Sequence, residues 1–546
     1  MSRLMLCGVA ALVFASSVLA QVDEAENKAV EHVEKLGGRV LRDDKRPGMP
    51  VVAVDLSSNQ KVTDEDLRVL ASLRNLRILN LSSTPVTNAG LKHLAALPNL
   101  ATLDLGYSKV TDSGLPLLAT FPKLTTLALD GTKVTPAGLK HLAAFKNLTS
   151  VDLTGFGIFY TEPQITTAFK KRTASYLLTH SQIGAGLREL LPIPTYTTLE
   201  VYYNEVPDAS LKELAANPKL AYLDLTGTKI TDAGLKELGP IQTLTTLNLR
   251  STKITDAGLK NLAGLKNLTA LDLTWTEVTD AGLKELAALP NLRELNLRGT
   301  KVTDAGLEHL AACPKLTELC LGETNAKGLK ALTALPNLTF LVLNAAELTE
   351  ADLKELVGAK ALARLEFNGA NIVNSTLKPV TELKNLKELS LRPSRVTGEG
   401  LQNLAALKNL TRFNLDLGGV ELTDKELKAL AGLTNLTELN LSETTFTGES
   451  LKYLAGLKNL TKLNLFYTLA SSGDLKELAG LTNLTELDVV YSGLTDVGLK
   501  NLAGLKNLTR LHLRCNDVTP KGVMELQKSL PKCWIDWIPG PEMNEP

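Results

Sequence analysis

The sequence has few aromatic residues, few cysteines and no net charge. Only 4% of its 546 residues are Phe, Trp or Tyr, so its core has to be built from aliphatic side chains. Five cysteines in so long a chain exclude a disulfide-stabilised scaffold. Lys and Arg together number 59, as do Asp and Glu. This balance excludes a global electrostatic attraction to nucleic acid or to an anionic membrane.

Sequence motifs for catalysis and metal binding are missing as well. The chain has no His-Glu-x-x-His, no Gly-x-x-x-x-Gly-Lys phosphate loop, no Gly-x-Ser-x-Gly and no clustered cysteine pairs. Its six histidines do not converge in the pattern. We therefore expect no catalytic residues, no metal and no cofactor, so that the protein is not an enzyme.

A repeat of 24 residues dominates what is present. The stretch Leu268–Leu292 holds one period and the first residue of the next, and the same pattern begins at Leu220, Leu244, Leu292 and Leu316. A short unit repeated through nearly the whole chain predicts a solenoid rather than a set of globular domains.

Each repeat changes its hydrophobic period once. Leu271-Asp272-Leu273 alternates, as in a short half-buried strand. Leu283, Leu286 and Leu289 are spaced by three, which predicts a short helix with one buried stripe. Thr279-Asp280 precedes this helix and can cap its first amides. One repeat cannot bury its leucines alone, so stacked repeats must do so together.

These residues resemble the leucine-rich repeat family. The form Leu-x-Leu-x-x-Thr-x-Val-Thr-Asp-Ala-Gly-Leu looks most like the cysteine-containing subtype, with Thr where that subtype often has Cys. It is also similar to exported leucine-rich repeat proteins of planctomycete bacteria, over about residues 51 to 538. The resemblance implies an α/β horseshoe of about twenty repeats, with parallel strands on the concave side and short helices on the convex side. It also implies a binding function.

The pattern divides the chain into four parts. We expect a signal peptide at 1–20, an N-terminal cap of helix plus hairpin at 21–53, the solenoid at 54–515, and a C-terminal cap and tail at 516–546. A degenerate repeat lies at 155–198, with Tyr176 and Leu178 in the strand positions. The period shortens by two residues at Glu323 to Gly328 and lengthens by two near Leu417.

The first twenty residues have the form of a secretory signal. Arg3 precedes the apolar run Leu4–Ala15, and Val18-Leu19-Ala20 offers a small-residue cleavage site before Gln21. The alternative is a membrane anchor, for which the run is short. We therefore expect an extracytoplasmic protein, periplasmic or secreted, that has no membrane span after cleavage and is monomeric.

Candidate binding residues lie at the variable positions in and after the strands, which we expect to face one side. Tyr, Trp and Arg dominate binding hot spots. They gather in two groups: Tyr202, Tyr203, Tyr222, Arg250, Trp275 and Arg298, and then Phe466, Tyr467, Asp488, Tyr491, Arg510, His512 and Arg514. The alternative is that these aromatic residues pack on the irregular 155–194 segment or stack on one another for stability.

The sequence therefore predicts a non-catalytic exported scaffold that binds a protein or peptide, and not nucleic acid, on its concave face. One alternative is a substrate adaptor like the F-box receptors of ubiquitin ligases, against which stand the signal peptide and the lack of an F-box-like helical segment. Arg-lined aromatic grooves can also hold glycans, and an enzyme inhibitor would be another form of binding.

Four local expectations can be checked directly. Cys320 should face outward on its strand, while Cys515 and Cys533 could form a disulfide that geometry does not favour. Asp232 and its equivalents should cap helices rather than bind calcium. Thr276 should satisfy backbone groups in the bend after the strand. Replacing Asp272 should cost little, because outward strand side chains should not hold the repeats together.

Overall fold

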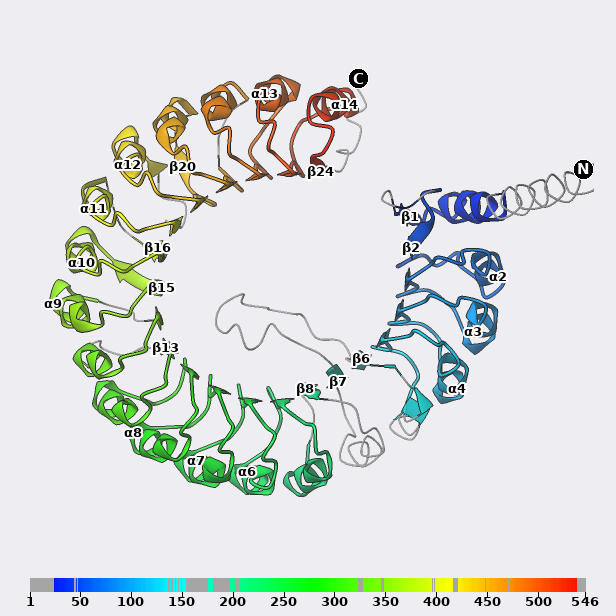
Figure 1. Cartoon of the computed structure of the whole chain (residues 1–546), viewed down its shortest axis with the longest axis horizontal. Helices are drawn as coiled ribbons and strands as arrows, with labels where there is room; N and C mark the ends of the chain where they lie inside the picture. The colour runs from blue at the N-terminus through cyan, green and yellow to red at the C-terminus, as the bar shows by residue number, and fades with distance from the viewer. Residues whose placement is uncertain are drawn as a thin grey trace, which may run out of the picture. The chain divides into compact units, whose positions relative to one another are not determined.

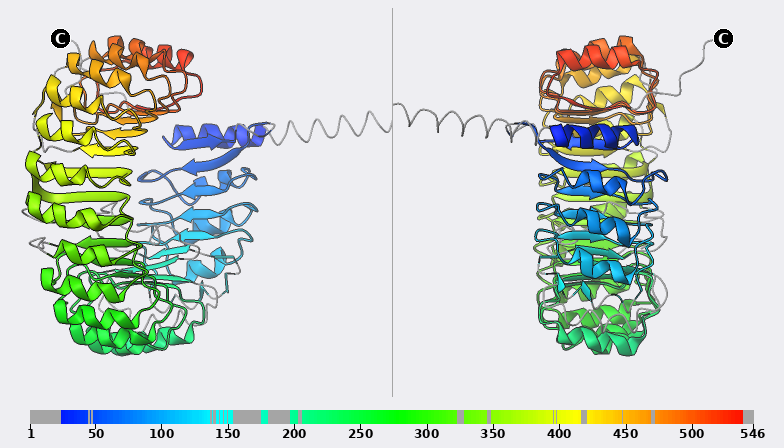
Figure 2. Two further views of the ribbon diagram at one scale, coloured as in Figure 1. Left: turned by 60° about the vertical axis from the view of Figure 1, so that its left-hand side comes forward. Right: turned by 90° about the vertical axis from the view of Figure 1, so that its right-hand side faces the viewer.

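The chain folds into two compact units, Met1–Leu268 and Thr269–Pro546, called here the N-terminal and C-terminal units. The computed structural model describes residues 24–153, 175–179, 197–202 and 206–537, with short gaps inside the first and last ranges. In each unit, strands lie along one side and helices along the other (Figures 1 and 2).

The N-terminal unit begins with a helix over residues 24–35 and an antiparallel strand pair. The pair is followed by parallel strands, each hydrogen-bonded to the next. The strands are β1 (Arg39–Arg42), β2 (Val51–Asp55), β3 (Ile78–Asn80), β4 (Thr102–Asp104), β5 (Thr126–Ala128), β6 (Ser150–Leu153), β7 (Ser175–Thr179), β8 (Thr198–Tyr202), β9 (Tyr222–Asp224) and β10 (Thr246–Asn248). The helices are α2 (Asp66–Leu70), α3 (Asn88–Leu94), η1 (Asp112–Gly114), α4 (Leu115–Leu118), η4 (Asp208–Ala216), α6 (Asp232–Leu238), α7 (Asp256–Asn261) and η5 (Leu262–Gly264).

The C-terminal unit repeats the same parallel pairing from β11 to β24, with β18 and β20 forming a separate small pair. The strands are β11 (Ala270–Asp272), β12 (Glu294–Leu297), β13 (Glu318–Leu321), β14 (Phe340–Leu343), β15 (Arg364–Ile372), β16 (Glu388–Ser394), β17 (Arg412–Leu415), β18 (Glu421–Leu422), β19 (Glu438–Asn440), β20 (Thr445–Phe446), β21 (Lys462–Asn464), β22 (Glu486–Asp488), β23 (Arg510–His512) and β24 (Trp534–Asp536). The helices are α8 (Asp280–Leu283), η6 (Lys284–Ala288), η7 (Asp304–Ala312), η8 (Leu329–Ala334), α9 (Glu350–Glu355), η9 (Leu356–Gly358), α10 (Asn374–Val380), α11 (Gly398–Leu404), α12 (Asp424–Leu430), η10 (Gly448–Gly456), η11 (Asp474–Gly480), α13 (Asp496–Leu502) and α14 (Pro520–Ser529).

The predicted strand parity is confirmed. Leu271 and Leu273 are buried, and Leu271 lies opposite the equivalent Leu295 of the next repeat. Leu319 pairs with Leu341 and Phe413 with Leu439, so the strands stay in register across the shortened and lengthened repeats. In the irregular part, Tyr176 lies opposite Val151 on one side and Leu199 on the other, so β7 fills the strand position expected there.

Several of the short helices are 3₁₀ rather than α-helices. The segments η4, η7, η10 and η11 are wholly 3₁₀, and α8 continues as η6. Leu283 and Leu286 are both buried. Leucines spaced by three eclipse one another in a helix of three residues per turn, so the tighter form keeps them on one buried face. The sequence showed the spacing of the leucines. It did not show whether helices this short would be α-helices or 3₁₀-helices.

Polar side chains join each repeat to its neighbours. The hydroxyl of Thr276 donates to the Leu273 carbonyl at 2.7 Å, as the expectation for this buried position required. Thr255 caps helix α7, because its hydroxyl accepts a hydrogen bond from the Ala257 amide at 3.3 Å. Asp232 instead bonds the next repeat: it accepts from the Thr255 amide at 2.9 Å and from the Thr255 hydroxyl at 2.6 Å. The prediction that these aspartates cap their own helices was therefore wrong, because Asp232 bonds the residue that caps the helix of the next repeat.

This inter-repeat contact explains the glycine in Asp-Ala-Gly-Leu. A Cβ placed on Gly258 would overlap the carboxylate of Asp232 from the preceding repeat. Gly234 and Gly306 meet Asp208 and Asp280 in the same way. The glycine is therefore needed for close approach and not for a special backbone angle.

We expect Gly258→Ala to lower the free energy of unfolding by about 1–3 kcal/mol, as overpacking does. The matched control is Gly504→Ala, because a Cβ there meets nothing within 4 Å. Urea denaturation of both variants checks this, and we expect the control to be unchanged or slightly more stable. Equal destabilisation of the two variants would contradict the packing argument.

Two expectations about strand residues were wrong. Cys320 is fully buried rather than exposed, although it lies at an outward strand position. Asp272 is also buried: its carboxylate accepts from the Thr274 amide at 2.8 Å and from the Asn296 side chain at 3.3 Å. Asp or Asn at this position closes the turn after the strand, so its identity is set by the fold. The four cysteines among the described residues are free.

Candidate functional site

The residue two positions beyond the strand leucines adopts a left-handed backbone in repeat after repeat. Gly227 and Gly299 have φ of 67°, and Ser251 has φ of 55°. Glycine adopts this conformation without cost, whereas another residue loses roughly 1–2 kcal/mol. Aromatic residues nevertheless occupy it, namely Tyr107 (55°), Trp275 (57°), Tyr467 (54°) and Tyr491 (55°). These side chains therefore lie at the turn after the strand.

The next repeat leaves room for two of these rings. A Cβ on Gly299 would lie 2.7 Å from the Trp275 ring, and one on Gly131 would overlap the ring of Tyr107. Each aromatic side chain therefore lies directly over the glycine of the following turn. Trp275 is nevertheless 55% exposed, so this packing covers only part of the indole.

Three aromatic side chains meet at the turns after β21 and β22, and are called here the aromatic cluster: Phe466, Tyr467 and Tyr491. The Phe466 ring centroid lies 6.2 Å from that of Tyr467 and 6.1 Å from that of Tyr491, and the two tyrosines are 6.1 Å apart. Both tyrosines are more than half exposed. Hydrogen bonding with the Cys515 thiol raises the pKa of the Tyr491 phenol above its ordinary value.

A second contact group follows on β23 and β24. The rings of His512 and Trp534 pack edge to face at 5.5 Å. His512 Nδ1 lies 3.4 Å from Asp536, and Arg514 Nε donates to Asp536 at 2.7 Å. Trp534 is 56% exposed. The predicted residues His512 and Arg514 are thus brought together by an aspartate that sequence reasoning did not select.

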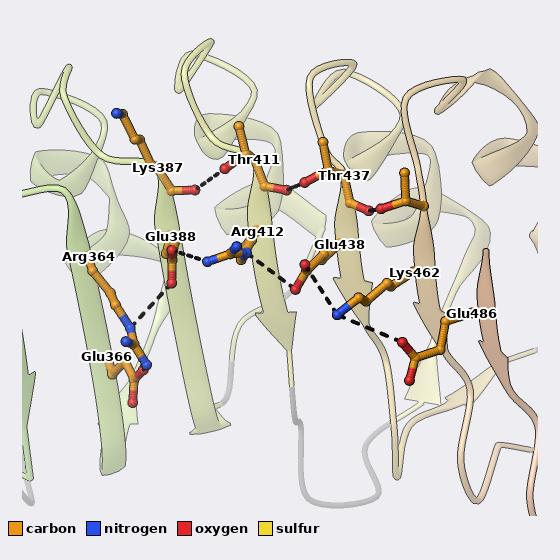
Figure 3. Close-up of polar contacts among 11 residues, drawn as sticks. Arg364, Glu366, Lys387, Glu388, Thr411, Arg412, Thr437, Glu438, Lys462 and Glu486 are labelled. Atoms are coloured by element: carbon orange, nitrogen blue, oxygen red, sulfur yellow. Dashed lines mark hydrogen bonds and ion pairs between the residues drawn. The ribbon is translucent and has the colours of Figure 1, made fainter. Parts of the chain in front are cut away.

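A ladder of alternating charge crosses the first strand positions of the C-terminal unit, and sequence reasoning missed it (Figure 3). Strand register places Arg364, Glu388, Arg412, Glu438, Lys462 and Glu486 side by side in this order. Arg364 Nε lies 3.3 Å from Glu388, and Arg412 Nε lies 3.3 Å from Glu438. Lys462 lies 3.6 Å from Glu438 and 3.8 Å from Glu486. The available signal was the alternation of charge from one repeat to the next.

This ladder forms the rim of a groove that encloses about 350 Å³. Its floor comes from the next outward positions of the same strands, including Glu366, Ser390, Asn414, Asn440, Asn464 and Asp488. The volume is near the lower end of the range for ligand pockets. The aromatic cluster adjoins it, because the Phe466 amide donates to Asn464 at 2.8 Å.

The remaining predicted residues do not form one group. Tyr202 ends β8, and Tyr222 is buried with its hydroxyl 3.3 Å from Asp224. Arg250 follows β10, and its amide donates to Asn248. These three residues belong to the N-terminal unit, whereas Trp275 and Arg298 belong to the C-terminal unit. Tyr203 lies outside the described residues.

In the second predicted group, Asp488 has a structural role in the turn after its strand. It accepts a hydrogen bond from the Val490 amide at 3.0 Å, in the same turn-closing role as Asp272. Arg510 is exposed and begins β23. Within the described residues, no group of three or more His, Cys, Asp or Glu side chains has the geometry to hold a metal ion. Nor does any described helix have the length and apolar character needed to cross a membrane.

Comparison with known proteins identifies the repeat. Leucine-rich repeat family models match residues 242–302 and also 72–95, 216–239, 432–455, 480–503 and 504–526. The structure of the TLR13–ssRNA13 complex is similar in fold, with a TM-score of 0.51, 20% sequence identity, and coverage of 86% of this chain and 75% of that one. A leucine-rich repeat protein of Leptospira interrogans has 23% identity and a TM-score of 0.33, over 88% of this chain and 94% of that one. No match was found among curated proteins.

Proposed function

We propose that this leucine-rich repeat protein is a non-catalytic scaffold that binds a protein or peptide ligand through the groove and the aromatic cluster of its C-terminal unit. One observation carries the proposal. Tyr467 and Tyr491 are more than half exposed and occupy left-handed turn positions where glycine would be unstrained. Non-glycine residues held in a left-handed backbone conformation cluster at functional sites.

The chemistry of the two adjoining surfaces suits a peptide. The aromatic cluster offers apolar ring faces, while the groove beside it is lined with charged and amide side chains. A peptide presents both kinds of group within a few residues, namely apolar side chains and polar main-chain groups. Tyrosine is also among the residues that contribute most to binding energy at interfaces. Stacking for stability alone would favour burying the rings, whereas these remain exposed.

The proposal extends to the nature of the protein. We assign the repeats to the cysteine-containing subtype, with Thr at the Cys position. We also propose that the protein belongs with the exported leucine-rich repeat proteins of planctomycete bacteria that it resembles. The protein is proposed to be monomeric. It is also proposed not to bind nucleic acid, because its 59 basic and 59 acidic residues balance.

A displayed library of random linear peptides, selected on the full-length protein, tests this function. We expect enriched peptides to bind the wild-type protein and to lose affinity when the aromatic cluster is altered. Two results would count against the proposal. One is a failure to enrich any peptide. The other is enrichment of peptides whose binding depends on substitutions of the helix side and not on those of the cluster.

Export is the second part of the proposal, and it predicts cleavage after Ala20. Residues 1–20 combine Arg3, an apolar run and Val18-Leu19-Ala20, as secretory signals do. Protein recovered from the periplasm or the medium should begin at Gln21 on N-terminal sequencing. Recovery of the chain with Met1 intact from the cytoplasm would contradict this part alone.

A further inference from the structure

Glu366 lies on the floor of the groove, and within the described part of the chain only one of its carboxylate oxygens accepts a hydrogen bond. Its Oε1 accepts from Arg364 Nε at 3.0 Å and from Arg364 Nη2 at 2.6 Å. Its Oε2 is buried and has no hydrogen-bond partner among the described residues. The side chain is only 9% exposed. Arginine often bridges both oxygens of a carboxylate, but here both hydrogen bonds end on Oε1 and leave Oε2 without a share in the pair.

Two neighbouring strands contribute further free acceptors at the same level. Strand register places Glu366 opposite Ser390, and Ser390 opposite Asn414. Within the described part of the chain, Ser390 Oγ and Asn414 Oδ1 are also buried without a hydrogen-bond partner. A buried polar atom that finds no partner costs free energy. Three such atoms lie in one row of the groove. A ligand with several N–H donors could supply the hydrogen bonds that they lack.

The charge of the groove favours a positive ligand. The side chains lining it include more carboxylates than cations: Glu366, Glu388, Glu438, Glu486 and Asp488 against Arg364, Arg412 and Lys462. Each of these cations already lies near two carboxylates. A ligand cation would therefore reduce the excess negative charge, whereas an anion would increase it.

We propose that Glu366, Ser390 and Asn414 form a subsite for a cationic group with several N–H donors, a guanidinium or an ammonium. The proposal rests on the binding function proposed above and names the chemistry that the groove selects. Such a group is presented by an Arg or Lys side chain of a peptide, or by a free polyamine. A guanidinium carries five donors and an ammonium three, so either can reach more than one acceptor of the row.

Access to the subsite depends on the ladder above it. The side chains of Arg364 and Arg412 are 39% and 52% exposed, and their long aliphatic stems allow the guanidinium groups to swing outward. Arg364 then acts as an internal competitor, because its own guanidinium occupies Glu366. Removing Arg364 should strengthen ligand binding, while neutralising Glu366 should weaken it. General electrostatics of the surface would not single out Glu366 in this way.

The experiment uses the full-length protein and three probes in isothermal titration. The probes are a blocked alanine pentapeptide with a central arginine, the same peptide with citrulline in place of arginine, and spermidine. Citrulline keeps the shape of arginine and removes its charge. We expect the arginine peptide to bind the wild type at least tenfold more tightly than the citrulline peptide. Glu366→Gln should abolish this difference, and Arg364→Ala should increase affinity at least threefold.

The control is Glu382→Gln, which makes the same charge change at an exposed position outside the groove; it should leave affinity unchanged. Thermal melting of each variant establishes that it is folded.

Spermidine binding that depends on Glu366 without peptide binding would identify a free polyamine as the source. Equal binding of the two peptides, equal effects of the two Glu→Gln variants, or no binding of any probe would overturn the subsite. Library-selected peptides that need Tyr467 but not Glu366 would overturn the subsite and leave the proposed function standing.

Discussion

Replacing Tyr467 and Tyr491 with serine is expected to weaken capture of a library-selected peptide at least tenfold for each substitution. A tenfold loss is about 1.4 kcal/mol, and truncating a central anchor commonly costs more. Stability should hardly change, because Ser251 and Ser83 occupy the same left-handed position in other repeats, with φ of 55° and 56°. Affinity is measured by titration of each variant, and stability by thermal melting.

The matched control is Tyr453→Ser, which removes a tyrosine from the helix side of the same unit, where its hydroxyl lies 3.3 Å from Asp424. Affinity should be unchanged in this variant. Trp275→Ser removes another exposed aromatic residue that lies outside the groove and the aromatic cluster, so it should also leave affinity unchanged. If the cluster variants keep full affinity while Tyr453→Ser loses it, the ligand binds the helix side.

Leu273→Ala is expected to lower the free energy of unfolding by about 2–5 kcal/mol through the cavity that it leaves. Leu273 is completely buried between repeats. The loss should appear in urea denaturation and as faster hydrogen exchange at the amides of β11 and β12, because repeat proteins lose stability locally.

Asp272→Ala provides the comparison, and the structure changes the expected result. The sequence suggested a negligible cost, but this carboxylate closes the turn at Thr274 and bonds Asn296. Losing two buried hydrogen bonds should cost about 1–3 kcal/mol. An unchanged stability of Asp272→Ala would show that the turn closes without this side chain. A loss larger than that of Leu273→Ala would mean that the leucine contributes less than its burial implies.

Most of the fold was predictable because it is local or periodic. The alternation of Leu271 and Leu273 shows which side of the strand is buried, and the 24-residue spacing brings equivalent leucines together. The pattern also showed that one repeat is two residues shorter near 323–328 and that another is two residues longer near 417. The strands remain in register across both repeats. The candidate site was predicted only in part. Phe466, Tyr467 and Tyr491 do meet, at the turns after β21 and β22.

The sequence by itself determined that each repeat contains a strand and a helix, and which leucines each repeat buries. It also determined that each repeat packs against the repeats before and after it in the chain. These depend on hydrophobic period and spacing, which can be read along one chain. Only the tertiary structure decided the left-handed backbone at Tyr467, the partner of Asp232 and the free oxygen of Glu366. Each of these depends on atoms brought close by stacking of repeats, whose distances and angles no linear spacing specifies. The same stacking converts charges that alternate from repeat to repeat into the ladder along the groove.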